Sequence, residues 1–163
     1  MKYLFITTTV ILIASCSSPD KSRQLQIQTD SLSSKLHNIY KPGFGEFMGN
    51  VQLHHAKLWF AGTNNNWRLA DYEVQEMQEA LANIQKYCTD RPESQVVDVL
   101  YPAIDSINNA IKNQSLQSFK SSYTLLTRTC NDCHKSTGHD FNVIITPTTV
   151  PVTDQDFKVK SPL

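Results

Sequence analysis

The sequence lacks an excess of basic residues, because Lys and Arg together number fifteen and so do Asp and Glu. A chain without a basic stripe offers no electrostatic footprint to nucleic acid, so we exclude nucleic acid as a partner. The chain also lacks an apolar run long enough for a permanent membrane span. No strand-like alternation precedes residue 140 and no internal repeat appears, which excludes β and repeat folds. Its 163 residues fit one domain.

The first fifteen residues have the pattern of an export signal. Lys2 supplies the positive end, and the apolar run after it has the length of a signal core. The run closes with Ile13-Ala14-Ser15-Cys16, which resembles the bacterial lipoprotein cleavage motif, in which the cysteine is acylated. The alternative is an ordinary secretory signal with a chance cysteine. We predict an exported protein that is lipid-anchored through Cys16 to a bacterial membrane, faces the periplasm, and has a polar tether over residues 16–30.

Apolar residues recur at helical spacing along most of the remaining chain. A short amphipathic helix is expected over Ser31–Tyr40, before the break at Pro42-Gly43. Four longer helices are expected over Phe44–Gly62, Trp67–Cys88, Ser94–Asn113 and from Ser115 to about Gly138. Helices of about twenty residues with short connections predict an all-α, up-down-up-down four-helix bundle, with residues 31–138 as the domain.

Two parts of this prediction depend on proline and on a short alternation. Pro102 lies inside the third expected helix, so that helix either kinks there or consists of two shorter pieces. The last segment, residues 139–163, has no helical period and is expected as an irregular or extended tail. Phe141, Val143 and Ile145 alternate within it, which favours an extended stretch packed against the bundle.

The strongest chemical signal is Cys130-Asn131-Asp132-Cys133-His134. The pattern C-x-x-C-H is the attachment signature of c-type haem, in which two thiols bind the porphyrin and the histidine binds the iron. A thioredoxin-like pair would need a βαβ context, and structural zinc would need a second ligand pair, neither of which appears. A simple disulfide leaves the histidine unexplained. We predict one covalent haem c, because both cysteines continue the core stripe of the last helix.

A four-helix bundle with a single C-x-x-C-H late in its last helix resembles the class II c-type cytochromes, the cytochrome c-prime superfamily. The resemblance covers residues 44–138. It implies an exported haem protein, and low-spin members of that family place an axial methionine early in the first helix. That position matches Met48 in this sequence.

The sixth iron ligand can also be approached from topology. In an up-down-up-down bundle the end of the last helix lies beside the start of the first, so Met48 should lie level with His134. Met77, in the middle of its helix, is expected as core filler. His55, two turns beyond Met48, is the alternative ligand, although an inward histidine is more often a satisfied core residue. The other histidines are weaker candidates: His54 points partly sideways, His139 lies close to His134 in sequence, and His37 precedes the break.

These residues predict a periplasmic one-electron carrier with no enzymatic activity and an unidentified redox partner protein. The alternative is a five-coordinate haem protein that binds a gas such as NO or CO. A haem enzyme is disfavoured because no distal acid–base pair can be assigned, and an interaction lipoprotein without haem remains as a fourth class. Cys88 is expected as a buried thiol, with a thiolate ligand or an intermolecular disulfide as alternatives, and a homodimer is a further possible assembly.

Overall fold

The computed structural model describes residues 19–37 and 42–159, and all regular structure in these ranges is helical. It comprises five α-helices and two short 3-10 helices, without a strand in the described residues, as the all-α prediction requires. The elements are α1 (Pro19–His37), α2 (Phe44–Thr63), α3 (Trp67–Tyr87), η1 (Pro92–Gln95), η2 (Val97–Leu100), α4 (Tyr101–Lys112) and α5 (Leu116–Ser136). Within these ranges no helix combines the length and the apolarity that a membrane span requires.

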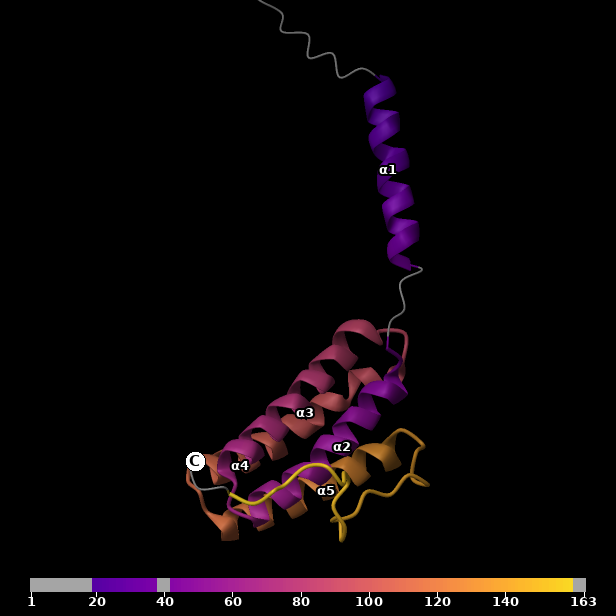
Figure 1. Ribbon diagram of the computed structural model, residues 1–163. Helices are drawn as coiled ribbons and strands as arrows, with labels where there is room; N and C mark the ends of the chain where they lie inside the picture. The colour runs from indigo at the N-terminus through magenta and orange to yellow at the C-terminus, as the bar shows by residue number, and fades with distance from the viewer. Residues whose placement is uncertain (1–18, 38–41, 160–163) are drawn as a thin grey trace, which may run out of the picture. The chain divides into compact units, whose positions relative to one another are not determined.

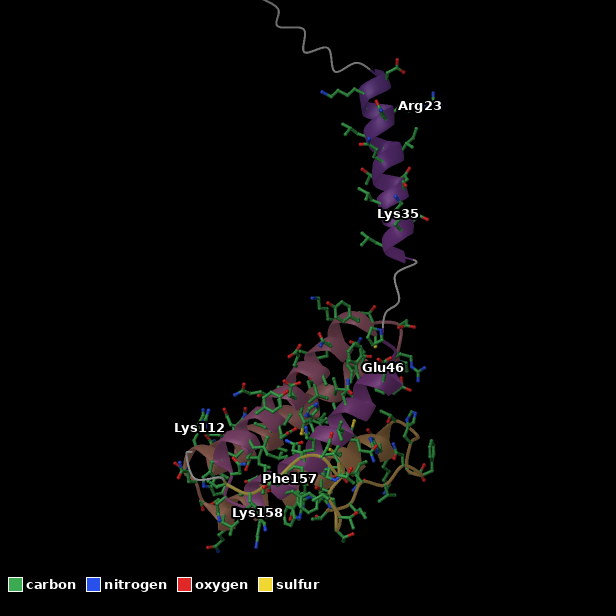
Figure 2. The ribbon with its side chains drawn as sticks, in the orientation of Figure 1. Arg23, Lys35, Glu46, Lys112, Phe157 and Lys158 are labelled. Atoms are coloured by element: carbon green, nitrogen blue, oxygen red, sulfur yellow. The ribbon has the colours of Figure 1, made fainter. Side chains whose placement is uncertain are left out.

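Helix α1 belongs to one unit of the chain, and the elements from α2 onward belong to another. The sequence predicted a tether up to residue 30 and a separate helix over Ser31–Tyr40, but one helix continues from Pro19 to His37. Residues with good helix propensity, chiefly Gln, Lys and Leu, explain this continuity. Arg23 and Lys35 mark its two halves in Figure 2, and its described side chains are exposed. Residues 38–40 and Cys16 lie outside the described residues.

Helices α2, α3, α4 and α5 pack side by side in the second unit (Figure 1). The most extensive contacts join α2 to α3 and α4 to α5. Each helix buries one apolar face, as the helical spacing predicts. The largest fully buried apolar side chains come from all four helices and include Leu58, Met77, Leu81, Ile84, Ile104, Ile107, Phe119, Tyr123 and Leu126.

The turn between α2 and α3 follows the local chemistry of its asparagines. Helix α2 ends at Thr63, and Asn65 adopts the left-handed backbone (φ 58°), which asparagine tolerates better than most residues. The side chain of Asn66 then accepts a hydrogen bond from the Leu69 backbone N–H (3.3 Å) and caps α3. The predicted bounds of both helices are confirmed to within one residue.

The third expected helix consists of shorter pieces, which is one of the two options that Pro102 left open, but the pieces before Tyr101 are not α-helical. Instead of an α-helix from Ser94, the chain forms η1 and η2, and α4 begins only at Tyr101. Pro102 therefore lies in the first turn of α4, where its missing N–H leaves no helical hydrogen bond unmade. The valines at positions 96, 97 and 99 have low helix propensity, which favours the shorter 3-10 turns before it.

The tail after α5 turns back along the helices, as the yellow trace in Figure 1 shows. Ser115 caps α5 as predicted, and Gly138 (φ 75°) adopts the left-handed backbone just after the helix end. The tail is irregular and packs against the helices, as expected, but it does not pack through the alternating residues. Phe141, Val143 and Ile145 are 81, 65 and 67 % exposed, respectively.

The tail instead packs through residues that the alternation did not select. Ile144 and Val152 are partly buried against the core, and Phe157 is buried (labelled in Figure 2). The Phe157 ring lies 5.7 Å from the Phe60 ring. The backbone carbonyl of Phe157 accepts a hydrogen bond from Asn66 Nδ2 (3.4 Å). The tail is therefore part of the packed unit.

Candidate functional site

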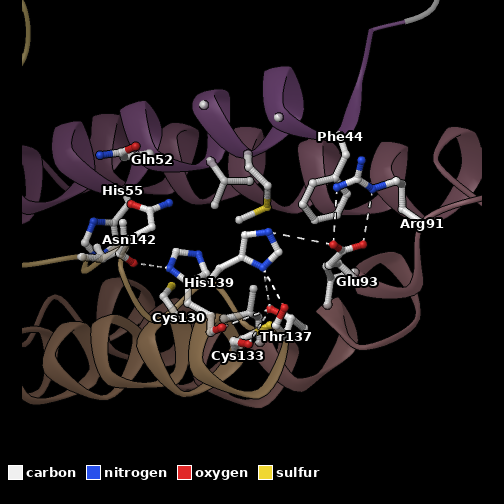
Figure 3. A pocket seen from close by; sticks show the side chains of 18 residues that line it. Phe44, Gln52, His55, Arg91, Glu93, Cys130, Cys133, Thr137, His139 and Asn142 are labelled. Carbon is white, nitrogen blue, oxygen red and sulfur yellow. Dashed lines mark hydrogen bonds and ion pairs between the residues drawn. The ribbon is translucent and has the colours of Figure 1, made fainter.

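A cavity of about 450 Å³ lies between α2 and α5 (Figure 3). The segment around η1 and η2 closes one end of it, and the tail closes another side. Its volume falls within the range of about 300–1,000 Å³ that is typical of ligand and cofactor sites. Three segments that are far apart in the sequence therefore meet at one hollow.

The wall formed by α5 carries all three functional residues of the C-x-x-C-H motif. Cys130, Cys133 and His134 line the cavity because positions three and four apart share one face of a helix. Both cysteines are free thiols, with Cys130 buried and Cys133 half-buried. Burial, together with the smaller effect of the neighbouring Cys133, raises the pKa of the Cys130 thiol to about 12. Burial also raises the pKa of Cys133.

The tail fixes the orientation of His134. The Nδ1 atom of this ring lies 2.6 Å from the backbone carbonyl oxygen of Asn142. A carbonyl oxygen can only accept, so Nδ1 carries the hydrogen, and in the neutral ring Nε2 bears the lone pair. Metal-binding histidines commonly have this arrangement, in which one nitrogen donates to a backbone carbonyl and the other faces the metal.

The opposite wall comes from the first part of α2. Met48 lines the cavity and is half-buried, so the prediction that it lies level with His134 agrees with the structure. Gly45 and Gly49 line the same wall, and a Cβ built on either would have no atom within 4 Å. A side chain at either position would therefore extend into open space. Met77 is fully buried in the core, away from this wall, as expected for core filler.

His55 reaches the cavity, but both of its ring nitrogens have protein partners. Nε2 lies 2.9 Å from Thr127 Oγ1, and Nδ1 lies 3.0 Å from the Tyr123 hydroxyl. The Thr127 hydroxyl already donates to the Tyr123 carbonyl, so it accepts from His55 Nε2. Burial lowers the pKa of His55 to about 4 and keeps the ring neutral. This geometry is that of a satisfied core histidine.

His54 lies outside the cavity wall and takes part in a different interaction. Its Nδ1 atom lies 2.6 Å from Glu73 Oε2, and Lys57 Nζ lies 3.1 Å from Glu73 Oε1. Glu73 is fully buried on α3, whereas the side chains of His54 and Lys57 are 15 and 14 % exposed. This buried acid–base cluster joins α2 to α3, and the sequence analysis did not identify it, although Glu73 lies on the core stripe one turn before Met77.

Sequence reasoning set His139 aside, but the structure places it in the cavity, as Figure 3 shows. Its Nδ1–H donates to the Thr137 carbonyl (2.9 Å), and its Nε2 faces Glu93 Oε1 at 3.9 Å. A backbone hydrogen bond at Glu93 and the Arg91 guanidinium lower the pKa of the Glu93 carboxyl. The sequence signal for a turn here is Gly138, which has the left-handed backbone in the structure.

Cys88 is buried at the end of α3 and is not part of the cavity wall. Burial raises the pKa of its thiol, as expected for an unreactive core cysteine. Within residues 19–37 and 42–159, no three His, Cys, Asp or Glu side chains converge closely enough to hold a bare metal ion.

Comparison of the chain with protein-family models, with curated proteins and with solved structures gave no match in any of the three.

Proposed function

We propose that this protein is a lipid-anchored c-type cytochrome that transfers single electrons on the periplasmic side of a bacterial membrane. One observation carries the proposal: Cys130, Cys133, His134 and Met48 line the same cavity from opposite helices. The proposal includes an up-and-down four-helix bundle over α2–α5, similar to that of class II c-type cytochromes. It includes a single haem in the cavity.

The residues present fit such a group in kind and in placement. Cys130 and Cys133 would hold it by thioether bonds, each formed when the S–H adds across one vinyl group, a step that requires no oxidant. His134 offers Nε2 as an axial ligand because its Nδ1 is already bound to Asn142. Gly45 and Gly49 leave the facing wall open for a planar molecule.

Bound haem supplies an iron that accepts and releases one electron. The protein residues around it determine how readily this happens. Met48 is the residue best placed to provide a second axial ligand, since methionine ligation raises the reduction potential. His55 is less suited, because its two nitrogens are engaged with Thr127 and Tyr123. His139 is an additional candidate that the structure introduces.

A five-coordinate, gas-binding protein is the second candidate function. The observation that favours it is the empty space around Gly45 and Gly49, which would leave room for a small diatomic ligand beside Met48. The visible spectrum separates the two functions. A low-spin spectrum with a methionine–iron band supports electron transfer, and a high-spin spectrum that changes with CO supports gas binding.

The proposal is tested by producing the full chain in a host with a cytochrome c maturation system. We expect haem staining on a denaturing gel and a mass increased by one haem. The variant Cys130→Ala/Cys133→Ala should lose both signals. Cys88→Ala is the matched control, because it removes a buried thiol outside the cavity, and it should keep them. A wild-type protein with the mass of the bare polypeptide and no Soret band contradicts the proposal.

The lipid anchor is tested separately. Cys16→Ser should abolish both the lipid mass and the membrane association while the haem is retained, because Cys16 belongs to the export motif and is separate in sequence from the C-x-x-C-H motif. Wild-type protein that is recovered free of lipid after export would contradict the anchor and leave the cytochrome assignment standing.

A further inference from the structure

Asn131, the first of the two residues between the cysteines, binds the tail at two points. Its Nδ2 donates to the Ile144 carbonyl (2.8 Å), and its Oδ1 accepts from the Ile144 backbone N–H (2.8 Å). The side chain thus pairs with the tail as a neighbouring strand would. It is half-buried, so water competes less for these two bonds than it would at an exposed residue.

The same stretch of tail is fixed to the motif at its other end. The His139 backbone N–H donates to the His134 carbonyl (2.7 Å), and the Asn142 N–H donates to the His139 carbonyl (2.9 Å). We call residues 139–144 the strap. Between its two fixed ends lies the Asn142 carbonyl, which accepts from His134 Nδ1 at 2.6 Å.

We propose that Asn131 is a positioning residue that sets the electron donation of His134 to the haem iron through the strap. This inference rests on the proposed function. A histidine that donates its Nδ1–H to a carbonyl becomes a stronger electron donor at Nε2, which stabilises ferric iron and lowers the reduction potential. Asn131 holds the carbonyl in place without touching the ring itself.

The strap is needed because His134 is only half-buried. If residues 142–144 moved away, the ring would donate to water, which would not fix its plane. Ordering these residues costs backbone entropy, and the two bonds from Asn131 offset part of that cost. Without them the Asn142 carbonyl would spend less time at the ring.

The test is the reduction potential of the holoprotein in four forms: wild type, Asn131→Ala, Ile144→Pro and Thr124→Ala. Asn131→Ala removes both bonds to the tail, and Ile144→Pro removes the backbone N–H that donates to Asn131 Oδ1. Thr124→Ala is the control, because Thr124 is exposed on α5 and bonds only to the Lys120 carbonyl of its own helix.

We expect both strap variants to bind haem and to have a higher potential than wild type, while the control stays unchanged. Loss of an outer partner typically weakens metal affinity about tenfold or more. A tenfold loss confined to the ferric state would raise the potential by about 59 mV in a one-electron couple. A purely structural role would lower the melting temperature without moving the potential.

The outcomes separate the two proposals. Wild-type protein without covalent haem overturns both of them. Haem-loaded strap variants with the potential of Thr124→Ala overturn the positioning role alone. Loss of haem from Asn131→Ala and Ile144→Pro, but not from the control, also overturns it, since it would assign the strap to maturation.

Discussion

A methyl group added at Gly62 would collide with the aromatic core. The Cβ of Gly62→Ala would lie 2.1 Å from Phe119 Cζ and 2.4 Å from both Cε atoms, far inside contact distance. A shift of the Phe119 ring would disturb its neighbours, because the ring is fully buried and the rings of Trp59, Trp67 and Tyr123 lie 6.4, 6.0 and 6.1 Å away. Either the ring or the end of α2 must shift.

The cost follows from two opposing effects. Forcing extra volume into a packed core costs about 1–3 kcal/mol. Replacing glycine by alanine inside a helix returns about 0.5–1 kcal/mol, and less at Gly62, which lies in the last turn of α2. We therefore expect Gly62→Ala to lower the free energy of unfolding by about 1–2 kcal/mol.

Gly49→Ala is the matched control, because it is the same exchange in the same helix with no atom within 4 Å of the new Cβ. It should raise the free energy of unfolding by about 0.5–1 kcal/mol. Urea unfolding of protein produced without haem attachment measures both values. Adding Phe119→Leu to Gly62→Ala should make the glycine exchange less costly than it is in wild type. If Gly62→Ala proves as stable as Gly49→Ala, the reasoning is refuted.

Three further predictions use the same protein. Met48→Ala should convert a low-spin spectrum to a high-spin one, whereas Met77→Leu should leave the spectrum unchanged; a low-spin spectrum in Met48→Ala would assign the ligand elsewhere. Burial lowers the pKa of His55 from 6.5 to about 4. The contribution of the neutral ring to the free energy of unfolding is therefore complete above pH 6.5 and is lost as the pH falls through about 4. The free energy of unfolding should fall by about 3 kcal/mol over this window in wild type, and His55→Gln should lack that part of the slope. Lys57→Met removes the cation beside Glu73 Oε1, while Oε2 keeps His54, and should cost about 3 kcal/mol in urea unfolding. Lys57→Met/Glu73→Leu should recover most of that cost.

The helices that the sequence predicted correctly are those with an unbroken period and local end signals. Helices α2, α3 and α5 begin and end within about two residues of the predicted positions, and Ser115 caps α5 as expected. The bounds of the third helix were not predicted because one proline fits two local structures equally well. A proline such as Pro102 can lie at a kink or in the first turn of a helix. The low helix propensity of the valines before it favours the first turn, which the structure has.

The placement of the motif residues at the cavity follows a short-range rule, and that of Met48 follows the expected packing of the helices. Spacing places Cys130, Cys133 and His134 on one face, and antiparallel packing brings the start of α2 to the end of α5. His139 was set aside on its separation along the chain. The turn at Gly138 brings His139 back into the cavity. The short separation of His139 from His134 in sequence does not indicate the direction that the chain takes after this turn.

The register of the tail shows why the remaining contacts were not predictable. An alternating segment has two possible phases, and a shift of one residue exchanges the inner and outer faces. Hydrophobicity alone favoured Phe141, Val143 and Ile145 as the inner set, but the side chain of Asn131 pairs with the backbone of Ile144 and fixes the other phase. The pairing exposes three apolar residues and places the Asn142 carbonyl at His134. Hydrophobic burial alone would favour the phase that buries Phe141, Val143 and Ile145. The observed register therefore follows the hydrogen bonds at the motif.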